Sequence, residues 1–397
     1  MLDSIYIGMS GLSAYSRGLQ TISNNVANLN TAGFKTSTPQ FADLYYGQRY
    51  APGLPGNPNV SYAGSGVEYG YASLNFTQGD TRASSGQLDL AIQGNGFLTV
   101  LDGQQARYER TGQFVVEPDG TLRDKGNGLQ LAALTSTGGV TGLSIAGKQL
   151  SPPQATTVVK FTDNISSGST SASVPNIDVY DANGGKHTLK VDLTPDTTAQ
   201  AGRWKVVVTD EKGATVQTDF LQFTGGIPDP GHSRIDVTLN SANAPLLTVS
   251  LDFSSGVTNF SAGTSSTLRV GSKDGYGTGT LSSLSVDDSG QLVIQYSNGQ
   301  TGQLGTVALA SFTDPQQLIQ MGKGLFDATH AAPPAYRASN GAGVGKLLSG
   351  ATEASNVDLS TEFGQLILIQ RGFQASSQVV STANEMIMQL LQMRSQG

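Results

Sequence analysis

Cysteine is absent from this chain of 397 residues, which excludes disulfides, thiolate metal ligands and cysteine nucleophiles. Charged residues make up only 13% of the chain, and the net charge of −7 gives no basic footprint, so no nucleic-acid partner is expected. No run approaches the ~18 apolar residues of a membrane span, so we expect no membrane insertion. Fifty glycines favour short strands and turns over a helical scaffold. The length indicates two or three domains.

The residues that usually carry enzyme chemistry are scattered. The three histidines, His187, His232 and His330, have no partner at metal-ligand spacing. The segment GAGVGKLL (341–348) looks like a phosphate loop, but Leu347 occupies the position that needs Ser or Thr, and no strand precedes it. Asp287 and Asp288 are explained as part of a hairpin turn. We therefore expect no enzyme, no metal, no cofactor and no small-molecule substrate.

The first 30 residues carry an amphipathic helical pattern. Apolar side chains recur at spacings of three, four and seven, and the polar face holds almost no charge beyond Asp3 and Arg17. A face so poor in charge is not typical of a helix in bulk water. The predicted apolar stripe consists of Ile5, Met9, Leu12, Leu19, Ile22 and Val26.

Residues 357–397 carry a second helical pattern. Its start is marked by Ser355 and Asp358 at capping-box-like spacing, with Asn356 as an alternative N-cap. Neither terminal helix can bury its apolar stripe alone. The predicted stripe of this helix consists of Leu366, Ile369, Phe373, Val380, Ala383, Ile387 and Leu390.

Between the ends the hydrophobic period changes from 3.6 to 2, which predicts strands joined by turns. We expect a mainly β fold with long terminal α-helices: an inner coiled-coil-like helix pair from the two termini, plus two outer antiparallel β domains. TDPQQLIQMG (313–322) predicts one short helix. The expected divisions are terminal helices at 1–30 and 357–397, an extended linker or strap at 31–70, a first β domain at 71–150 and 273–356, and an inserted outer β domain at 151–272.

The terminal stripes allow two interpretations. In the first, the two helices pack on each other as the core of a monomeric domain, as in a soluble β-rich enzyme or carbohydrate-binding module. In the second, copies of the chain surround the helices, because Ser, Asn and Gln on their outer faces can hydrogen-bond laterally without the desolvation cost of charges. The position of both helices at the extreme ends of the sequence favours the second.

The ends of the chain also resemble a known family. NNVANLNTAGFKTSTPQFADLYY (24–46) is similar to the N-terminal signature of the flagellar rod and hook proteins, and EASNVDLSTEFGQLILIQRGFQASSQVVSTANEMIMQLLQMR (353–394) resembles their C-terminal motif. LDLAIQGNGFLTV (88–100) and the segment 108–131 resemble their first β domain. The matched motif residues are Asn24, Asn25, Asn28, Asn30, Thr31, Gly33, Phe34 and Lys35.

The resemblance implies a structural role in the bacterial flagellum. The inserted segment 151–272 looks like that of hook proteins, whereas Tyr15, Ser16 and Arg17 depart from the alanine-rich family pattern, so a distal rod protein is the alternative. Family members polymerise with themselves into a helical tube. The hook is a flexible, curved universal joint that transmits torque from the rod and motor to the filament.

The resemblance also implies partners and a location. The expected partners are other copies of the chain, the rod, the hook cap, the hook–filament junction proteins and the flagellar type III export apparatus. The subunit would leave the cell unfolded through the flagellar channel and end in the extracellular hook. The sequence MLDSIYIGMSGLSAYSRGLQ has no basic region followed by an apolar run, so we expect no cleaved signal peptide.

Overall fold

The computed structural model describes residues 2–50, 60–196, 198, 200–240 and 245–395. The chain forms two compact units. The first unit comprises Met1–Ala146, Leu284–Val293 and Gln303–Gly397, and the second comprises Gly147–Ser283 and Ile294–Gly302. The first unit therefore contains both ends of the chain, and the second is inserted between parts of it.

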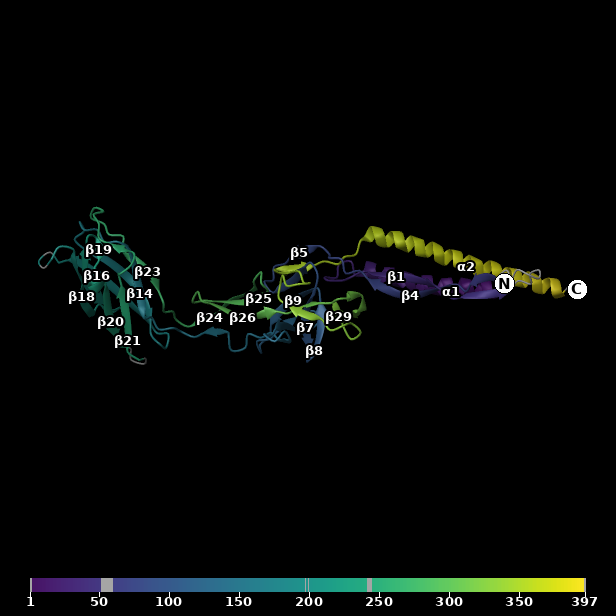
Figure 1. Ribbon diagram of the computed structural model, residues 1–397, viewed down its shortest axis with the longest axis horizontal. Coiled ribbons are helices and arrows are strands. Elements are labelled where there is room, and N and C mark those ends of the chain that lie inside the picture. Colours follow the sequence, from purple (N-terminus) through teal and green to yellow (C-terminus); the bar gives the residue numbers. More distant parts are fainter. Residues whose placement is uncertain (1, 51–59, 197, 199, 241–244, 396–397) are drawn as a thin grey trace. The chain divides into compact units, whose positions relative to one another are not determined.

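Two long helices from opposite ends of the sequence pair within the first unit. Helix α1 spans Leu2–Ala27 and helix α2 spans Leu359–Ser395. They run antiparallel, because Asn25 of α1 contacts Glu362 near the start of α2, whereas Gly8 lies against Val380 further along it. Figure 1 shows the two helices side by side, with strands β1 (Ser37–Asp43) and β4 (Val67–Leu74) along α1. The expected helix pair is thus confirmed.

Strands β1 and β4 form a two-stranded antiparallel ribbon on α1. Phe41 of β1 packs on Tyr15 of α1 with 5.5 Å between ring centroids, and the hydroxyls of Tyr69 and Thr21 lie 2.9 Å apart. Beyond the ribbon, β2 (Tyr46–Tyr50) pairs with β3 (Val60–Gly64). Residues 51–59, the centre of the expected strap, lie outside the described residues. The strands on either side of that gap pair in antiparallel orientation.

The β part of the first unit is built from short, mostly antiparallel strands. An aromatic cluster holds part of it together, with Phe97 packed edge-on against both Phe326 and Phe312. The strands are β5 (Thr81–Ala83), β6 (Asp89–Gln93), β7 (Phe97–Asp102), β8 (Gln105–Glu109), β9 (Thr111–Val116), β10 (Leu122–Asp124), β11 (Gln130–Leu134), β12 (Val140–Gly142), β27 (Leu309–Ser311), β28 (Ile319–Gly322), β29 (Leu325–Asp327), β30 (Ala335–Arg337), β31 (Lys346–Ser349) and β32 (Ala351–Glu353). The chain passes between the units through β24 (Gly279–Val286), β25 (Gln291–Tyr296) and β26 (Thr301–Val307).

The short helix predicted at 313–322 is wrong. Asp314 does cap a turn, but that turn is a 3₁₀-helix limited to Pro315–Gln317. The chain then extends into β28, which pairs with β29 through Gln320 and Phe326. A single turn gains little from helix propagation, so pairing with the neighbouring strand decides the structure of the rest of this segment.

The second unit has its own hydrophobic core between two sheets. One sheet has the order β20, β21, β14, β22, with β23 also on β14, and the other runs from β15 to β19. Phe161 and Phe253 stack at 4.2 Å in the core, which also buries Trp204. The strands are β13 (Leu150–Ser151), β14 (Val158–Asn164), β15 (Ala172–Tyr180), β16 (Lys186–Pro195), β17 (Arg203–Thr209), β18 (Thr215–Thr224), β19 (Ile227–Pro228), β20 (Arg234–Leu239), β21 (Leu247–Asp252), β22 (Val257–Thr258) and β23 (Arg269–Lys273), with a 3₁₀ turn at Pro230–His232.

The mainly β architecture with two terminal helices is confirmed. The pairing departs from a purely antiparallel pattern at β14, which is parallel to both β21 and β22. Antiparallel neighbours joined by tight turns, such as β17 and β18, make up most of the same unit. In the part of the chain that the structure describes, neither helix is apolar enough over sufficient length to cross a membrane.

Candidate assembly interface and its anchoring site

The contact between α1 and α2 is made largely by small residues. A Cβ on Gly8 would lie 2.6 Å from Val380 Cγ2, and a Cβ on Gly372 would lie 2.6 Å from the Tyr15 ring. Such distances are closer than side chains tolerate, so these glycines let the two helices approach one another. The helices therefore use only part of their apolar surface on each other.

The predicted stripe of α1 lies along and beside this seam. Ile22 is fully buried, whereas Met9 is 53% exposed. The remaining four residues are partly buried: Ile5, Leu12, Leu19 and Val26. Tyr6 and Ile7, which were not predicted, add further exposed apolar surface at the start of the helix. The exposed apolar surface of α1 is thus concentrated near the start of the helix, at Tyr6, Ile7 and Met9.

The predicted stripe of α2 is divided in the same way. Ile369 and Ala383 are buried against α1, Leu366, Val380 and Ile387 are partly buried, and Phe373 and Leu390 are exposed. A second apolar line, which sequence periodicity did not separate from the first, runs along one flank of the helix. Its members are Leu368, Val379, Met386, Leu390 and Met393, and all five are exposed. Their spacings of 11, 7, 4 and 3 keep them on one helical face.

The asparagine-rich motif ends α1 and joins it to two other elements. Asn25 is 1% exposed; its Nδ2 donates to both carboxylate oxygens of Glu362 at 3.1 Å and to the Ser37 carbonyl at 2.8 Å. The Asn25 Oδ1 accepts the Ser37 backbone N–H at 3.0 Å. Burial raises the pKa of Glu362, and the hydrogen bond from Asn25 opposes that rise. A single side chain thus fixes the end of α1 to the start of α2 and to β1.

The other motif residues shape the turn after α1. Asn28 Nδ2 donates to the Asn24 carbonyl at 2.8 Å, and Thr31 Oγ1 donates to Asn28 Oδ1 at 3.0 Å. Gly33 has φ +69°, in the left-handed region that favours glycine, and its N–H donates to the Glu353 carbonyl at 2.8 Å. Asn30 is exposed, and Phe34 is half-buried. This turn leads directly to Lys35.

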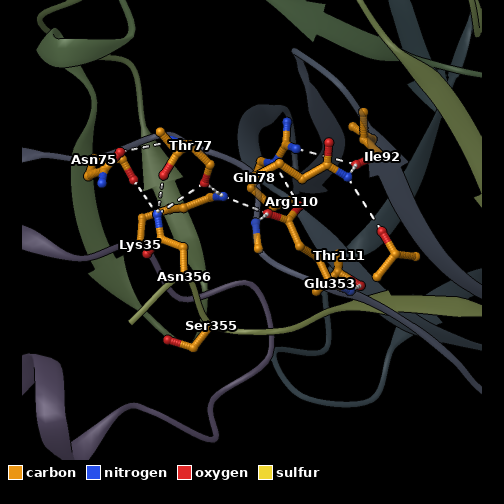
Figure 2. Close-up of polar contacts among 12 residues, drawn as sticks. Lys35, Asn75, Thr77, Gln78, Ile92, Arg110, Thr111, Glu353, Ser355 and Asn356 are labelled. Carbon is orange, nitrogen blue, oxygen red and sulfur yellow. Dashed lines mark hydrogen bonds and ion pairs between the residues drawn. The ribbon is translucent and has the colours of Figure 1, made fainter. Parts of the chain in front are cut away.

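Lys35, Glu353 and Arg110 form a buried ionic cluster where both helices meet the β part of the unit (Figure 2). Lys35 Nζ lies 2.5 Å from Glu353 Oε1, and Arg110 Nε lies 3.0 Å from Glu353 Oε2. Both carboxylate oxygens are therefore used, and the side chains of Lys35 and Glu353 have no exposed area. Burial lowers the pKa of Lys35, while the Glu353 carboxylate raises it.

Backbone groups complete the cluster. Lys35 Nζ also donates to the Thr77 carbonyl at 2.7 Å, and the Arg110 guanidinium donates to the carbonyls of Gly94 and Gly96. The Gly79 N–H donates to Glu353 Oε1 at 3.0 Å. Two cations share one anion, and carbonyl dipoles accept their other protons, which is the condition for burying such charges.

The expected capping residues of α2 have separate roles. Asp358 immediately precedes the helix, and its Oδ1 accepts the Ser360 N–H at 2.8 Å. Asn356 instead joins the segment before β1 to the segment after β4: its Oδ1 accepts the Thr36 N–H, and its Nδ2 donates to the carbonyls of Asn75 and Thr77 (Figure 2). Ser355 Oγ accepts the Val357 N–H at 3.4 Å.

Sequence reasoning did not find Glu353, Arg110 or the partner of Asn25. Lys35 and Glu353 are 318 positions apart, so no local pattern could pair them. One signal in the sequence could have indicated these residues. Charged residues make up only 13% of the chain, so each of them is a candidate for a specific contact. Within the described residues no three His, Asp or Glu side chains gather as a metal site would require.

Both ends of the chain match families of flagellar axial proteins. Residues 5–35 match the family described as flagella basal body rod protein, and residues 348–393 match the flagellar basal body rod FlgEFG protein C-terminal family. These matched segments contain most of α1, the turn to Lys35, β32 and most of α2. The helix pair, Lys35 and Glu353 therefore lie in the segments that match this class of flagellar axial proteins, whereas Arg110 lies outside them.

Full-length relatives narrow the class. The flagellar hook protein FlgE of Salmonella typhimurium is 30% identical over 97% of this chain and 98% of its own length, and that of Borreliella burgdorferi is 28% identical over 99% and 100%. The crystal structure of Helicobacter pylori flagellar hook protein FlgE2 has a TM-score of 0.46 and 13% identity, covering 67% of this chain and 98% of its own. The chain belongs to the flagellar hook protein family and is a structural subunit of the hook. Relatives that match across the inserted unit favour the hook over the rod.

Proposed function

We propose that this chain polymerises through α1 and α2 into a helical tube that bends while it transmits torque. The exposed apolar line of α2 (Leu368, Val379, Met386, Leu390 and Met393) is the observation that carries the proposal. A helix in contact with water normally shows charge on its outer face, whereas here large apolar side chains remain outside the pair. Neighbouring copies would bury them, and a contact between different surfaces of identical copies extends without closing.

The antiparallel register supports this arrangement. Because Gly8 lies against Val380, the start of α1 at Leu2 falls opposite a position near residue 386. The last turns of α2 therefore extend past α1, and Met388, Leu390, Leu391 and Met393 are all exposed there. In a tube this overhang would pack against other copies.

The division of labour rests on the two units. The helix pair would form the wall of the tube, and the anchoring cluster of Lys35, Glu353 and Arg110 would carry load from the helices to the β part of the first unit. The segment 151–272 would form the outer sliding surface that permits curvature, and the segment 47–66 would tie neighbouring copies together. The rod, the hook cap and the hook–filament junction proteins would contact the ends of the tube.

Export would precede assembly. The subunit would pass unfolded through the flagellar channel by the type III apparatus, without signal cleavage, and add at the distal end. A chain without cysteine cannot form a disulfide that would obstruct passage. Assembly would then stabilise the helices further, since neighbouring copies would bury the apolar surface that stays exposed in a single subunit.

The substitution Leu390→Asp tests the proposal, with Gln389→Asp as the matched control. Both side chains are exposed in the single chain, so neither substitution should disturb the fold of a subunit. In the tube Leu390→Asp would bury a charge in the apolar line, whereas Gln389→Asp adds the same charge at a position that is already polar and lies outside that line. Polymerisation seeded with short fragments and followed by sedimentation and electron microscopy should fail only for Leu390→Asp. Normal growth of that variant would contradict the proposed interface.

A further inference from the structure

An exposed aromatic pair lies where the β1–β4 ribbon turns away from α1. Tyr45 is 77% exposed and Tyr46 is 58% exposed. The preceding residue, Leu44, donates its N–H to the Gly66 carbonyl at 2.9 Å, and Gly66 lies against Ser10 and Ile7 of α1. We call Asp43, Tyr45, Tyr46 and Glu68 the ribbon end. It lies beside the first turns of α1.

The ribbon end combines two aromatic rings with negative charge. Asp43 ends β1, and Glu68 pairs with Ala42 across the ribbon; both carboxylates are exposed. Tyrosine is among the residues that contribute most binding energy at protein interfaces, because it buries a large ring and keeps a hydroxyl for a hydrogen bond. Two adjacent tyrosines in water are therefore a candidate contact.

A cavity of about 280 Å³ lies at the other end of α1. One wall is the asparagine-rich turn, with Asn24, Asn28 and Phe34, and the other is the hairpin of β28 and β29, with Gln320 and Lys323. Lys323 is exposed at the hairpin tip and has no ion-pair partner among the described residues. The cavity is large enough for one aromatic ring, and its lining offers amide groups to a phenol hydroxyl.

The ribbon end and the cavity lie at opposite ends of one helix. Ile7, beside the ribbon end, and Asn24, at the cavity, are separated by roughly 26 Å along α1 at 1.5 Å per residue. Two different surfaces that lie apart on one subunit are what a head-to-tail contact requires, and repetition of such a contact produces an open filament. The acidic carboxylates at one end and Lys323 at the other give the charges the signs needed for attraction.

We propose that the ribbon end of one copy docks in the cavity of the next copy, with a tyrosine ring in the cavity and Asp43 or Glu68 near Lys323. This inference rests on the proposed function, since it assigns a contact within the homopolymer. It makes Tyr45 and Tyr46 determinants of growth along the axis, and it assigns a second role to the asparagine-rich turn, which lines the receiving surface.

Cysteine crosslinking tests the docking directly, because the chain has no native cysteine. Polymers are grown from an equal mixture of Tyr45→Cys and Lys323→Cys subunits and then oxidised. Disulfide-linked dimers are expected in the mixture and in neither variant alone. The matched control mixes Tyr45→Cys with Lys125→Cys, an exposed lysine in the turn after β10, and should give no dimer. Polymers that form without a crosslink would overturn the docking and leave the proposed function standing. Failure of the unsubstituted chain to polymerise would overturn the proposed function instead.

Solution variants give a second readout. Replacing both Tyr45 and Tyr46 by Ser removes whichever ring the cavity of the next copy buries, and should raise the critical concentration for polymerisation on the order of 100-fold. Tyr71→Ser is the matched control, since Tyr71 is a similarly exposed tyrosine on β4, and should change that concentration less than twofold. Equal effects of the double variant and of Tyr71→Ser would overturn the assignment. Binding of a small aromatic solute such as phenol in the cavity, with polymerisation unchanged, would do the same.

Discussion

Replacement of Glu353 by Gln gives the most demanding test of the anchoring cluster. The carboxylate lies 2.5 Å from Lys35 Nζ and 3.0 Å from Arg110 Nε, and its side chain is fully buried. A neutral amide of nearly the same size would leave two buried cations without an anion. Breaking a buried ion pair by removing one partner costs about 3–5 kcal/mol. We expect the first unit to lose that much free energy of unfolding.

The two units can be followed separately during this experiment. The chain has one tryptophan, Trp204, which lies in the core of the second unit. Tryptophan fluorescence therefore reports unfolding of the second unit, while far-UV circular dichroism at 222 nm in the helical band reports the first. With a urea m-value of about 3 kcal/mol/M, Glu353→Gln should lower the midpoint of the circular dichroism transition by roughly 1–1.7 M. The fluorescence midpoint should not move.

Adding Lys35→Met to the Glu353→Gln variant provides the internal control. The second substitution removes one of the two cations left without an anion, so the double variant should regain part of the lost stability. Together with Lys35→Met alone, it completes a double-mutant cycle that gives the interaction energy of Lys35 with Glu353. A loss below about 1 kcal/mol in the single variant, or a circular dichroism shift matched by an equal fluorescence shift, would refute the idea that this carboxylate anchors the helices.

Other contacts lead to further expected outcomes. Asn25→Asp replaces the donor to Glu362 by a second carboxylate, and should lower the free energy of unfolding in the circular dichroism transition by about 1–3 kcal/mol. The control Asn24→Asp, at an exposed position one residue away, should lower it far less. Equal losses would contradict the role of Asn25. Burial raises the pKa of Glu109 well above its usual value. The stability that its protonated form contributes is therefore complete below the unfolded pKa and is lost as pH rises through the folded pKa. Glu109→Gln should remove this loss, so that the free energy of unfolding in urea falls less as pH rises, and an unchanged slope would count against this. Deleting 151–272 should give polymers that are straight in electron micrographs, and a failure to polymerise would rule out the separate roles of the units. Limited proteolysis of the monomer should remove α2 before it cuts the β part of the first unit or the second unit. Protection of both helices would favour a closed monomeric domain.

The extent of the two helices could be predicted from periodicity, but the face that each presents could not. The spacing of Ile5, Met9 and Leu12 defines an apolar side of α1, yet the contact with α2 also runs over Gly8 and Gly11. Glycine carries no hydrophobic signal, so a pattern based on apolar residues places the seam to one side of its true position. Phe373 and Leu390 were assigned to the same stripe as Ile369, and the structure leaves both exposed.

Contacts between distant segments were beyond any local pattern. Asn25 was matched as a motif residue, but its partners, Glu362 and Ser37, come from two other elements. In the segment 313–322 the local pattern was present but did not decide the structure. Asp314, Pro315 and Gly322 are typical start and stop signals of a helix, yet pairing with a neighbouring strand determines the structure after the first turn. Local signals determine where the turn begins, whereas packing within the β part of the first unit determines the conformation of the residues that follow it.

The shared carboxylate of Glu353 gives the two helices a common attachment to the β part of the first unit, in addition to the covalent chain. Lys35 comes after α1, and Glu353 precedes α2, so tension on either helix reaches their common ion pair within a few residues. From there it would pass through Arg110 to the carbonyls of Gly94 and Gly96, in the turn between β6 and β7. Pulling one helix away from the sheet would therefore strain the root of the other, and the two would yield together.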